Sequence, residues 1–368
     1  MRDDPGVNGG MRVIDADGHI LEDNEAIAAL LPPEYRRMAQ RTQQGTRGLF
    51  PPLDSLHTMF RDQPAILEGR GRVGPSEWLA FMADVGIDAA VLFPSGGLAV
   101  GRIPYPEVAV AITRAYNDWL FQAYVDRDPA FKGMGLLPMQ DPLAAVAELR
   151  RIVTDYGFRG AMLPSNGLKD HLGARQFWPV YEAANELGCA ICVHGGSHSG
   201  LGLDQLDVWP FITGLGHSIG LAVSFAGIVS NGLLDRFPNL RFGFLEGGIG
   251  WFLMCVERFS EACASFQQYD PQARFFQLRE GENMRAYLQR HIECGRIFVG
   301  CEGDEPGLAR LVQEFGPSPF VYSSDFPHEV TNATCKHELQ ELLDNPVLSS
   351  DAKAAILHGN AERLYRLG

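Results

Sequence analysis

The sequence repeats one pattern eight times, a short apolar run followed by a segment with helical punctuation. Most of these runs are nearly continuous in Val, Ile, Leu, Phe, Met and Ala, which is typical of parallel strands buried on both faces. The runs span Arg12–Asp17, Ala89–Phe93, Gly133–Pro138, Gly160–Leu163, Ala190–His194, Leu240–Glu246, Ile297–Gly300 and Phe320–Asp325. Eight strands that alternate with helices predict an α/β fold, a closed (β/α)8 TIM barrel.

The segments between the runs favour helices in the expected places. Asp141-Pro142 supplies a cap and a first-turn proline for a helix over Leu143–Tyr156, and further helices are predicted over Ala174–Leu187 and Ile219–Phe237. A doubly wound open sheet is the alternative, but the sequence lacks its glycine-rich dinucleotide turn after an early strand. The barrel is therefore the preferred prediction.

The chain is predicted to form a single domain. Residues 1–10 are polar and glycine-rich and are expected to be a flexible N-terminus, and residues 11–368 form the barrel. The segment 22–88, between the first two strands, is longer than a connection needs and contains many proline, glycine and polar residues. Because long loops on the carboxyl side of a barrel shape the pocket, we predict that segment 22–88 is a cap or lid.

Composition excludes several classes of protein. Hydrophobic residues make up 46% and charged residues 21% of the 368 residues, which is ordinary for a globular enzyme. The formal net charge of −14 disfavours binding to nucleic acid. The sequence has no apolar run of the ~18–20 residues that a membrane span needs, and residues 1–10 do not resemble a signal peptide. The seven cysteines, an odd number, predict reduced thiols and a cytoplasmic location.

Polar side chains stand at the carboxyl ends of four predicted strands, where catalysis occurs in a barrel. The first strand carries Asp17 and His19, the fifth ends at His194, the sixth at Glu246 and the eighth at Asp325. Asp17 and His19 face the same side of an extended segment. Two histidines with the carboxylates of Asp17 and Asp325 are typical ligands of a divalent cation.

Several motifs resemble the amidohydrolase superfamily. These motifs are Asp15-Ala-Asp-Gly-His19, His194, Leu234-Asp-Arg-Phe-Pro-Asn-Leu-Arg-Phe-Gly-Phe-Leu-Glu-Gly-Gly248, Ser323-Ser-Asp-Phe-Pro-His328 and Gly359-Asn-Ala-Glu-Arg-Leu-Tyr365. Within the superfamily, they look like the branch of aminocarboxymuconate-semialdehyde decarboxylase and γ-resorcylate decarboxylase. The resemblance extends from Arg12 to Leu367, with little of it in Glu22–Asp88.

The resemblance implies a barrel that holds one divalent cation, Zn²⁺ or Mn²⁺, through Asp17, His19, His194 and Asp325. It also implies a small-molecule substrate and a homo-oligomer, either a dimer or a tetramer. Many members carry His-x-His on the first strand, and Asp17 is a harder ligand that makes manganese more competitive with zinc. Decarboxylases of the branch often end the sixth strand with a histidine, where this chain has Glu246.

The identity of the proton donor is open between two residues. His217 lies near the start of a predicted helix and is a candidate acid or substrate-carboxylate partner; the alternative is a water-exposed histidine at a helix start. Glu246 is the second candidate, because burial beside an anion keeps a carboxyl group protonated. His198 and His328 are candidate substrate-binding residues, and the alternative role of His328 is to support Asp325.

Three functions are open on this evidence. The preferred prediction is a metal-dependent decarboxylase, a lyase that acts without oxidation on an aromatic or unsaturated carboxylic acid. The alternative enzyme is a hydrolase of an amide, ester or lactone, in which Asp325 takes the proton of an activated water. The third possibility is a catalytically silent binding subunit. The candidate catalytic residues are His217, Glu246 and Asp325.

Overall fold

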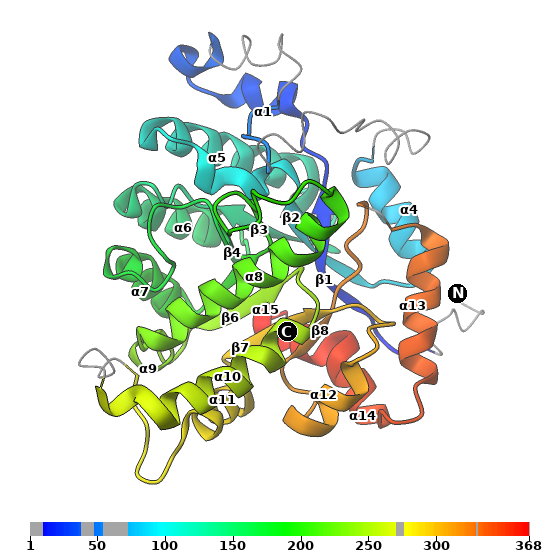
Figure 1. The fold of residues 1–368 in the computed structure, drawn as a ribbon. Coiled ribbons are helices and arrows are strands. Elements are labelled where there is room, and N and C mark those ends of the chain that lie inside the picture. Colours follow the sequence, from blue (N-terminus) through cyan, green and yellow to red (C-terminus); the bar gives the residue numbers. More distant parts are fainter. Residues whose placement is uncertain (1–9, 38–47, 54–72, 270–275, 329, 368) are drawn as a thin grey trace.

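The computed structural model describes residues 10–37, 48–53, 73–269, 276–328 and 330–367. Eight strands form one sheet in which each strand pairs in parallel with the next along the chain. The strands are β1 (Ile14–Ile20), β2 (Ala89–Pro94), β3 (Phe131–Leu136), β4 (Gly160–Pro164), β5 (Ala190–His194), β6 (Arg241–Leu245), β7 (Ile297–Cys301) and β8 (Phe320–Tyr322). This order, with helices between the strands, confirms the predicted (β/α)8 barrel (Figure 1).

The barrel closes where the segment after β8 meets β1. The Asp325 N–H donates a hydrogen bond to the Asp17 carbonyl at 3.2 Å. The Asp15 carboxylate adds a side-chain link, because it accepts hydrogen bonds from the Ser324 N–H at 3.0 Å and from the Ser324 hydroxyl at 2.6 Å. These bonds hold the end of β1 against the segment that carries Asp325.

The strands are buried almost throughout, as their apolar sequences predict. Among the residues of β1 to β8, all but Lys132 in β3 are buried. The polar residues Asp15, Asp17, His19 and His194 are at most 1% exposed. Ionisable side chains at such depth need hydrogen bonds, partner charges or a bound cation.

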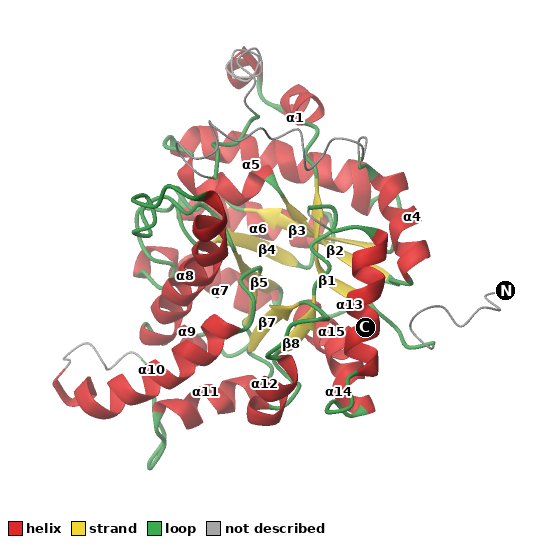
Figure 2. Ribbon diagram, turned by 45° about the vertical axis from the view of Figure 1, so that its right-hand side comes forward, coloured by secondary structure: helices red, strands yellow, loops and turns green. Residues whose placement is uncertain are grey.

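Helices surround the strands on the outside of the barrel (Figure 2). The α-helices are α1 (Asn24–Leu30), α4 (Pro75–Val85), α5 (Pro106–Leu120), α6 (Pro142–Asp155), α7 (Trp178–Leu187), α8 (Trp209–Ser230), α9 (Leu233–Arg236), α10 (Gly250–Phe266), α11 (Met284–Glu293), α12 (Leu308–Phe315), α13 (Asn332–Asp344), α14 (Ser350–Ala354) and α15 (Asn360–Tyr365). Shorter 3₁₀ or π turns span Gly96–Arg102, Phe121–Val125, Arg175–Phe177, Gln267–Tyr269 and Ala355–Gly359. The Asp141 side chain accepts hydrogen bonds from the Leu143 and Ala144 N–H groups, both at 3.1 Å, which confirms the predicted cap of α6.

Both predicted boundaries of one helix are wrong. The sequence predicts a helix over Ile219–Phe237, whereas α8 begins at Trp209 and ends at Ser230. The glycines at Gly214 and Gly216 favour a loop in the sequence, because glycine weakens a helix. Tertiary packing overrides this preference, since α8 packs against β5 and α10.

Within the described residues, α8 is also the one helix long and apolar enough to cross a membrane by length and composition. In the most apolar 18-residue stretch of α8, 50% is buried inside the protein. We therefore assign α8 to the helical layer of the barrel.

Segment 22–88 combines barrel structure with additional chain. α4 is the barrel helix between β1 and β2, and Trp78 on it is fully buried. The short stretch 48–53 reaches the loop after β5, where the Ser197 hydroxyl donates to the Leu53 carbonyl at 2.8 Å. The remaining parts of this segment, 38–47 and 54–72, lie outside the described residues, as do residues 1–9 of the predicted N-terminus. The role of segment 22–88 as a lid therefore stays a prediction.

Candidate metal centre and proton donors

Three predicted ligands from β1 and β5 meet inside the barrel. The Nε2 atoms of His19 and His194 lie 3.2 Å apart. Asp17 Oδ1 lies 3.3 Å from His194 Nε2 and 3.8 Å from His19 Nε2. All three side chains are buried, and their ligand atoms are close enough to hold one metal ion. The carboxyl ends of two strands on different sides of the barrel thus deliver their side chains to one point.

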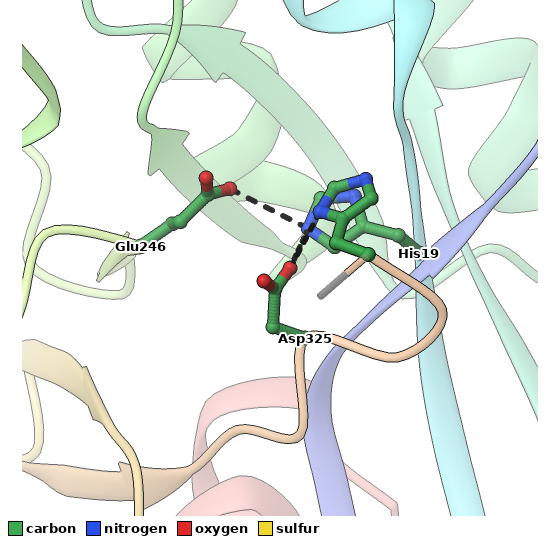
Figure 3. A group of neighbouring side chains, drawn as sticks. His19, Glu246 and Asp325 are labelled. Atoms are coloured by element: carbon green, nitrogen blue, oxygen red, sulfur yellow. Dashed lines mark hydrogen bonds and ion pairs between the residues drawn. The ribbon is translucent and has the colours of Figure 1, made fainter. Parts of the chain in front are cut away.

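Two further carboxylates reach the same point from the ends of β6 and β8 (Figure 3). Glu246 Oε2 lies 3.6 Å from His19 Nε2 and 3.2 Å from His194 Nε2, and Asp325 Oδ1 lies 3.5 Å from His19 Nε2. Both residues have a left-handed backbone, with φ of 56° at Glu246 and 53° at Asp325. This conformation is uncommon outside glycine and is often found at functional sites. We call Asp17, His19, His194, Glu246 and Asp325 the central cluster.

Backbone carbonyls fix the orientation of both histidine rings. His19 Nδ1 lies 2.7 Å from the Pro94 carbonyl oxygen, and His194 Nδ1 lies 2.9 Å from the Gly195 carbonyl oxygen. A carbonyl oxygen only accepts hydrogen bonds, so in the neutral rings each Nδ1 carries the proton and each Nε2 presents a lone pair. Histidines that bind a metal through Nε2 are held in this way.

Two buried oxygens of the central cluster, Asp17 Oδ1 and Glu246 Oε2, have no hydrogen bond to any residue that the structure describes. Both face His194 Nε2, at 3.3 and 3.2 Å. Lone pairs on oxygen and nitrogen repel at such distances unless positive charge lies between them. Two imidazole nitrogens and three carboxylates fit a divalent cation such as Zn²⁺ or Mn²⁺.

When no cation is bound, protons supply this positive charge. Burial raises the pKa of Glu246 to about 8. Burial by itself lowers the pKa of His194, but the neighbouring Asp17 and Glu246 outweigh it and raise that pKa to about 9. Metal ligands must be deprotonated, so a bound cation takes the place of the proton on His194 Nε2.

A second pair of histidines stands beside the central cluster. His217, on α8, has its Nε2 3.3 Å from Glu246 Oε1. His198, in the loop after β5, has its Nε2 3.3 Å from His217 Nε2. Burial is the main reason that the pKa of His217 lies well below its usual value, and the nearby His198 and His194 lower it further. His217 therefore lies within α8 and faces Glu246, rather than standing exposed at a helix start.

Glycines leave the space that these two rings occupy. A Cβ atom at Gly216 would overlap the His198 ring, and a Cβ atom at Gly195 would overlap the His217 ring. Glycine is therefore needed at position 216 for packing, although it weakens the helical pattern of the sequence just before His217. This close approach explains why the sequence of this part of α8 resembles a loop.

His328 supports the central cluster from the segment after β8. Its Nδ1 lies 2.7 Å from Asp325 Oδ1, and its ring stacks on His19 with centroids 4.1 Å apart and 28° between the planes. These contacts agree with a role of His328 in supporting Asp325. Substrate binding by His328 and by His198 stays a prediction.

Two features of the site are not evident from the sequence. The sequence marks Glu246 only as a candidate acid, whereas its Oε2 lies beside the predicted ligands His194 and His19. Its position at the end of β6 is the signal that marks it, since the other ligands also follow strands. The second feature is Ser95, whose hydroxyl lies 2.8 Å from His328 Nε2. Ser95 directly follows β2, but a lone serine at a strand end carries no specific signal.

Comparison with known protein families assigns this barrel to one of them. A family model described as Amidohydrolase matches residues 14–367. The chain belongs to the amidohydrolase family. The match spans all eight strands of this amidohydrolase, from β1 to the end of β8 and beyond, and confirms the resemblance seen in the strand-end motifs.

Two curated relatives and one solved structure are similar to this amidohydrolase over most of its length. A 2-amino-3-carboxymuconate-6-semialdehyde decarboxylase of Dictyostelium discoideum is 25% identical over 259 residues, covering 70% of this chain and 67% of the relative. A γ-resorcylate decarboxylase of Polaromonas sp. is 22% identical over 346 residues, covering 85% of this chain and 98% of the relative. The crystal structure of a 5-carboxyvanillate decarboxylase from Novosphingobium aromaticivorans, complexed with manganese and 4-hydroxy-3-methoxy-5-nitrobenzoic acid, has a TM-score of 0.73 at 19% identity and covers 100% of both chains. This structural likeness supports the fold.

Proposed function

We propose that this amidohydrolase is a metal-dependent decarboxylase that removes carbon dioxide, without oxidation, from an aromatic or unsaturated carboxylic acid. The observation that carries the proposal is the central cluster, in which two imidazole nitrogens and three carboxylates converge at the carboxyl end of the barrel. The three similar proteins are all named as decarboxylases, which supports this reaction among those of the family.

In this proposal Asp17, His19, His194 and Asp325 hold one divalent cation, and Glu246 is close enough to be a further ligand. Manganese is the preferred cation, because carboxylates are hard ligands and three of them line the cluster. The manganese in the 5-carboxyvanillate decarboxylase structure supports this choice over zinc.

When bound, the cation supplies positive charge that attracts the substrate carboxylate and an adjacent oxygen and stabilises developing negative charge. The protein itself supplies the proton. Glu246 Oε1 and His217 Nε2 are 3.3 Å apart beside the central cluster, so a proton held between them is within reach of a substrate there. Glu246 and His217 are 24% and 17% exposed, so the pair is largely shielded but still exchanges protons with solvent.

The proposed reaction begins with the proton held between Glu246 and His217. This proton adds to the substrate carbon that bears the carboxylate and forms a new C–H bond. The bond from this carbon to the carboxylate then breaks, its electron pair returns to the ring or double-bond system, and carbon dioxide leaves. Solvent returns a proton to the Glu246–His217 pair, which completes the cycle.

Hydrolysis of an amide, ester or lactone is the second candidate. One observation favours it: Glu246 occupies the place where related decarboxylases often have histidine, and a carboxylate can accept the proton of an attacking water. Asp325 is the other candidate base in that reaction. His198 is proposed to bind the substrate in either case, because its Nε2 contacts His217 beside the central cluster. His328 is proposed to line the substrate pocket with its ring, because Asp325 and Ser95 engage its two ring nitrogens.

A substrate panel separates the two reactions. Purified protein, stripped with a chelator and reloaded with Mn²⁺, is assayed for carbon dioxide release from hydroxybenzoates and unsaturated dicarboxylic acids, and for hydrolysis of nitrophenyl esters and lactones. The proposal expects metal-dependent carbon dioxide release that is lost in Asp325→Asn. Metal-dependent hydrolysis without decarboxylation would favour the second candidate, and neither activity would favour a silent binding subunit.

We also propose a homo-oligomer in the cytoplasm. Exposed apolar side chains on α8 and α10, such as Phe211, Leu215, Val223 and Met254, support a self-association surface. The seven cysteines are all free, which is in keeping with a reducing compartment. Light scattering coupled to size-exclusion chromatography tests the oligomer, and a mass equal to one chain would contradict it.

A further inference from the structure

Both ring nitrogens of His328 make polar contacts, and the partner of one of them lies outside the central cluster. Nδ1 lies 2.7 Å from Asp325 Oδ1, and Nε2 lies 2.8 Å from Ser95 Oγ. The ring also stacks on His19, with centroids 4.1 Å apart. His328 therefore touches two predicted ligands on one side and a serine hydroxyl on the other.

The chemistry of these partners defines the tautomer of His328. A carboxylate oxygen only accepts hydrogen bonds, so Nδ1 carries a proton toward Asp325. In the neutral ring Nε2 is then an acceptor, and the Ser95 hydroxyl is the group that donates to it. A side chain without a hydroxyl at position 95 would leave Nε2 without this donor and the ring freer to turn.

Ser95 is itself held in place by a carboxylate that lies outside the central cluster. Glu22, two residues after β1, accepts hydrogen bonds from the backbone N–H groups of Ser95 at 3.1 Å, Gly96 at 3.0 Å and Gly97 at 2.8 Å. Three amides converging on one carboxylate make a rigid loop at the end of β2. These bonds hold the backbone from which the Ser95 side chain reaches His328.

The Asp325 carboxylate accepts this support through Oδ1, at a position whose backbone is left-handed with φ of 53°. We propose that Ser95, anchored by Glu22, is a positioning residue for the metal site: it holds His328 in the tautomer and orientation that fix the Asp325 carboxylate as a ligand. This inference rests on the metal-binding part of the proposed function. Partners that orient a ligand in this way typically change metal affinity by about 10–100-fold.

The test measures Mn²⁺ affinity directly, without any substrate. Stripped full-length protein is titrated with Mn²⁺, and free Mn²⁺ is followed by its electron paramagnetic resonance signal. Ser95→Ala is expected to raise the dissociation constant about 10-fold, with an unchanged thermal unfolding midpoint. Ser260→Ala is the matched control, because the Ser260 hydroxyl donates only within α10, to the Val256 carbonyl, away from the site; it should bind Mn²⁺ as wild type does.

A double-mutant cycle separates positioning from a general structural effect. If Ser95 acts through His328, Ser95→Ala has no further effect on Mn²⁺ affinity in a His328→Ala background. An unchanged dissociation constant for Ser95→Ala would overturn the inference. So would a loss of Mn²⁺ affinity on Ser95→Ala that is equally large in the wild-type and His328→Ala backgrounds. Failure of the wild-type protein to bind Mn²⁺ would instead overturn the proposed metal site itself.

Discussion

Glu246 Oε2 lies 3.2 Å from His194 Nε2, and this oxygen has no hydrogen bond to any residue that the structure describes. A buried carboxylate beside a histidine lone pair is costly unless a positive charge stands between them. The contact therefore links a residue expected to act as an acid to the predicted metal ligands. It makes the role of Glu246 the first question for experiment.

Replacing Glu246 by glutamine keeps the size of the side chain and removes its charge. We expect Glu246→Gln to weaken Mn²⁺ binding by at least ~10-fold, because the loss of a direct ligand costs no less than the loss of a partner that orients one. Glu261→Gln is the control, since Glu261 lies on α10 and pairs with Arg258 at the exposed surface. Equal Mn²⁺ affinity in Glu246→Gln and wild type would show that Glu246 is not a ligand.

Asp325→Asn should remove nearly all turnover and leave the fold intact. Asparagine tolerates the left-handed backbone that Asp325 adopts, and the position lies at the barrel mouth rather than in the packed layers. Circular dichroism and thermal unfolding check the fold, and carbon dioxide release checks the activity. Substantial activity in the asparagine variant would place the reactive site elsewhere.

His217→Ala tests the proton donor. If the Glu246–His217 pair delivers the proton, kcat falls by at least ~100-fold while KM changes little, as for a positioned acid. If His217 instead binds the substrate carboxylate, the main effect is on KM. Steady-state kinetics on a substrate found in the panel separate these roles, and unchanged kcat and KM would remove His217 from both.

Two glycines of α8 offer a matched pair of substitutions. A Cβ atom at Gly214 meets no atom within 4 Å, so Gly214→Ala should stabilise the helix by up to about 1 kcal/mol and leave activity unchanged. A Cβ atom at Gly216 would overlap the His198 ring, so Gly216→Ala should lose this gain and reduce turnover. Thermal unfolding and activity measured on both variants check the pair. Equal behaviour of the two would contradict the proposed packing around His198.

The sequence predicts the barrel and the convergence of its ligands for the same physical reason. Parallel strands buried on both faces leave apolar runs in the sequence, and barrel closure brings all their carboxyl ends to one mouth. Asp17 and His194 could therefore be predicted as neighbours from strand ends alone. The sequence does not reveal that Glu246 turns its Oε2 inward, because this depends on a left-handed backbone angle. Nor does it reveal Ser95, whose contact with His328 is made by loops far apart in the sequence.

The start of α8 could not be predicted for a different reason. Glycine disfavours a helix in isolation, and only the neighbouring imidazoles explain Gly216. A contact between segments thus outweighs the local preference. The predicted lid stays untested, because two stretches of it, 38–47 and 54–72, lie outside the described residues.

The most direct test of the account is an anomalous-scattering map from crystals of the Mn²⁺-loaded protein. The account predicts one manganese peak at the carboxyl end of the barrel, within about 2.0–2.3 Å of ligand atoms from Asp17, His19, His194 and Asp325. A map with no peak among these side chains, in protein shown to contain manganese, would contradict the proposed metal centre and the decarboxylation chemistry that depends on it.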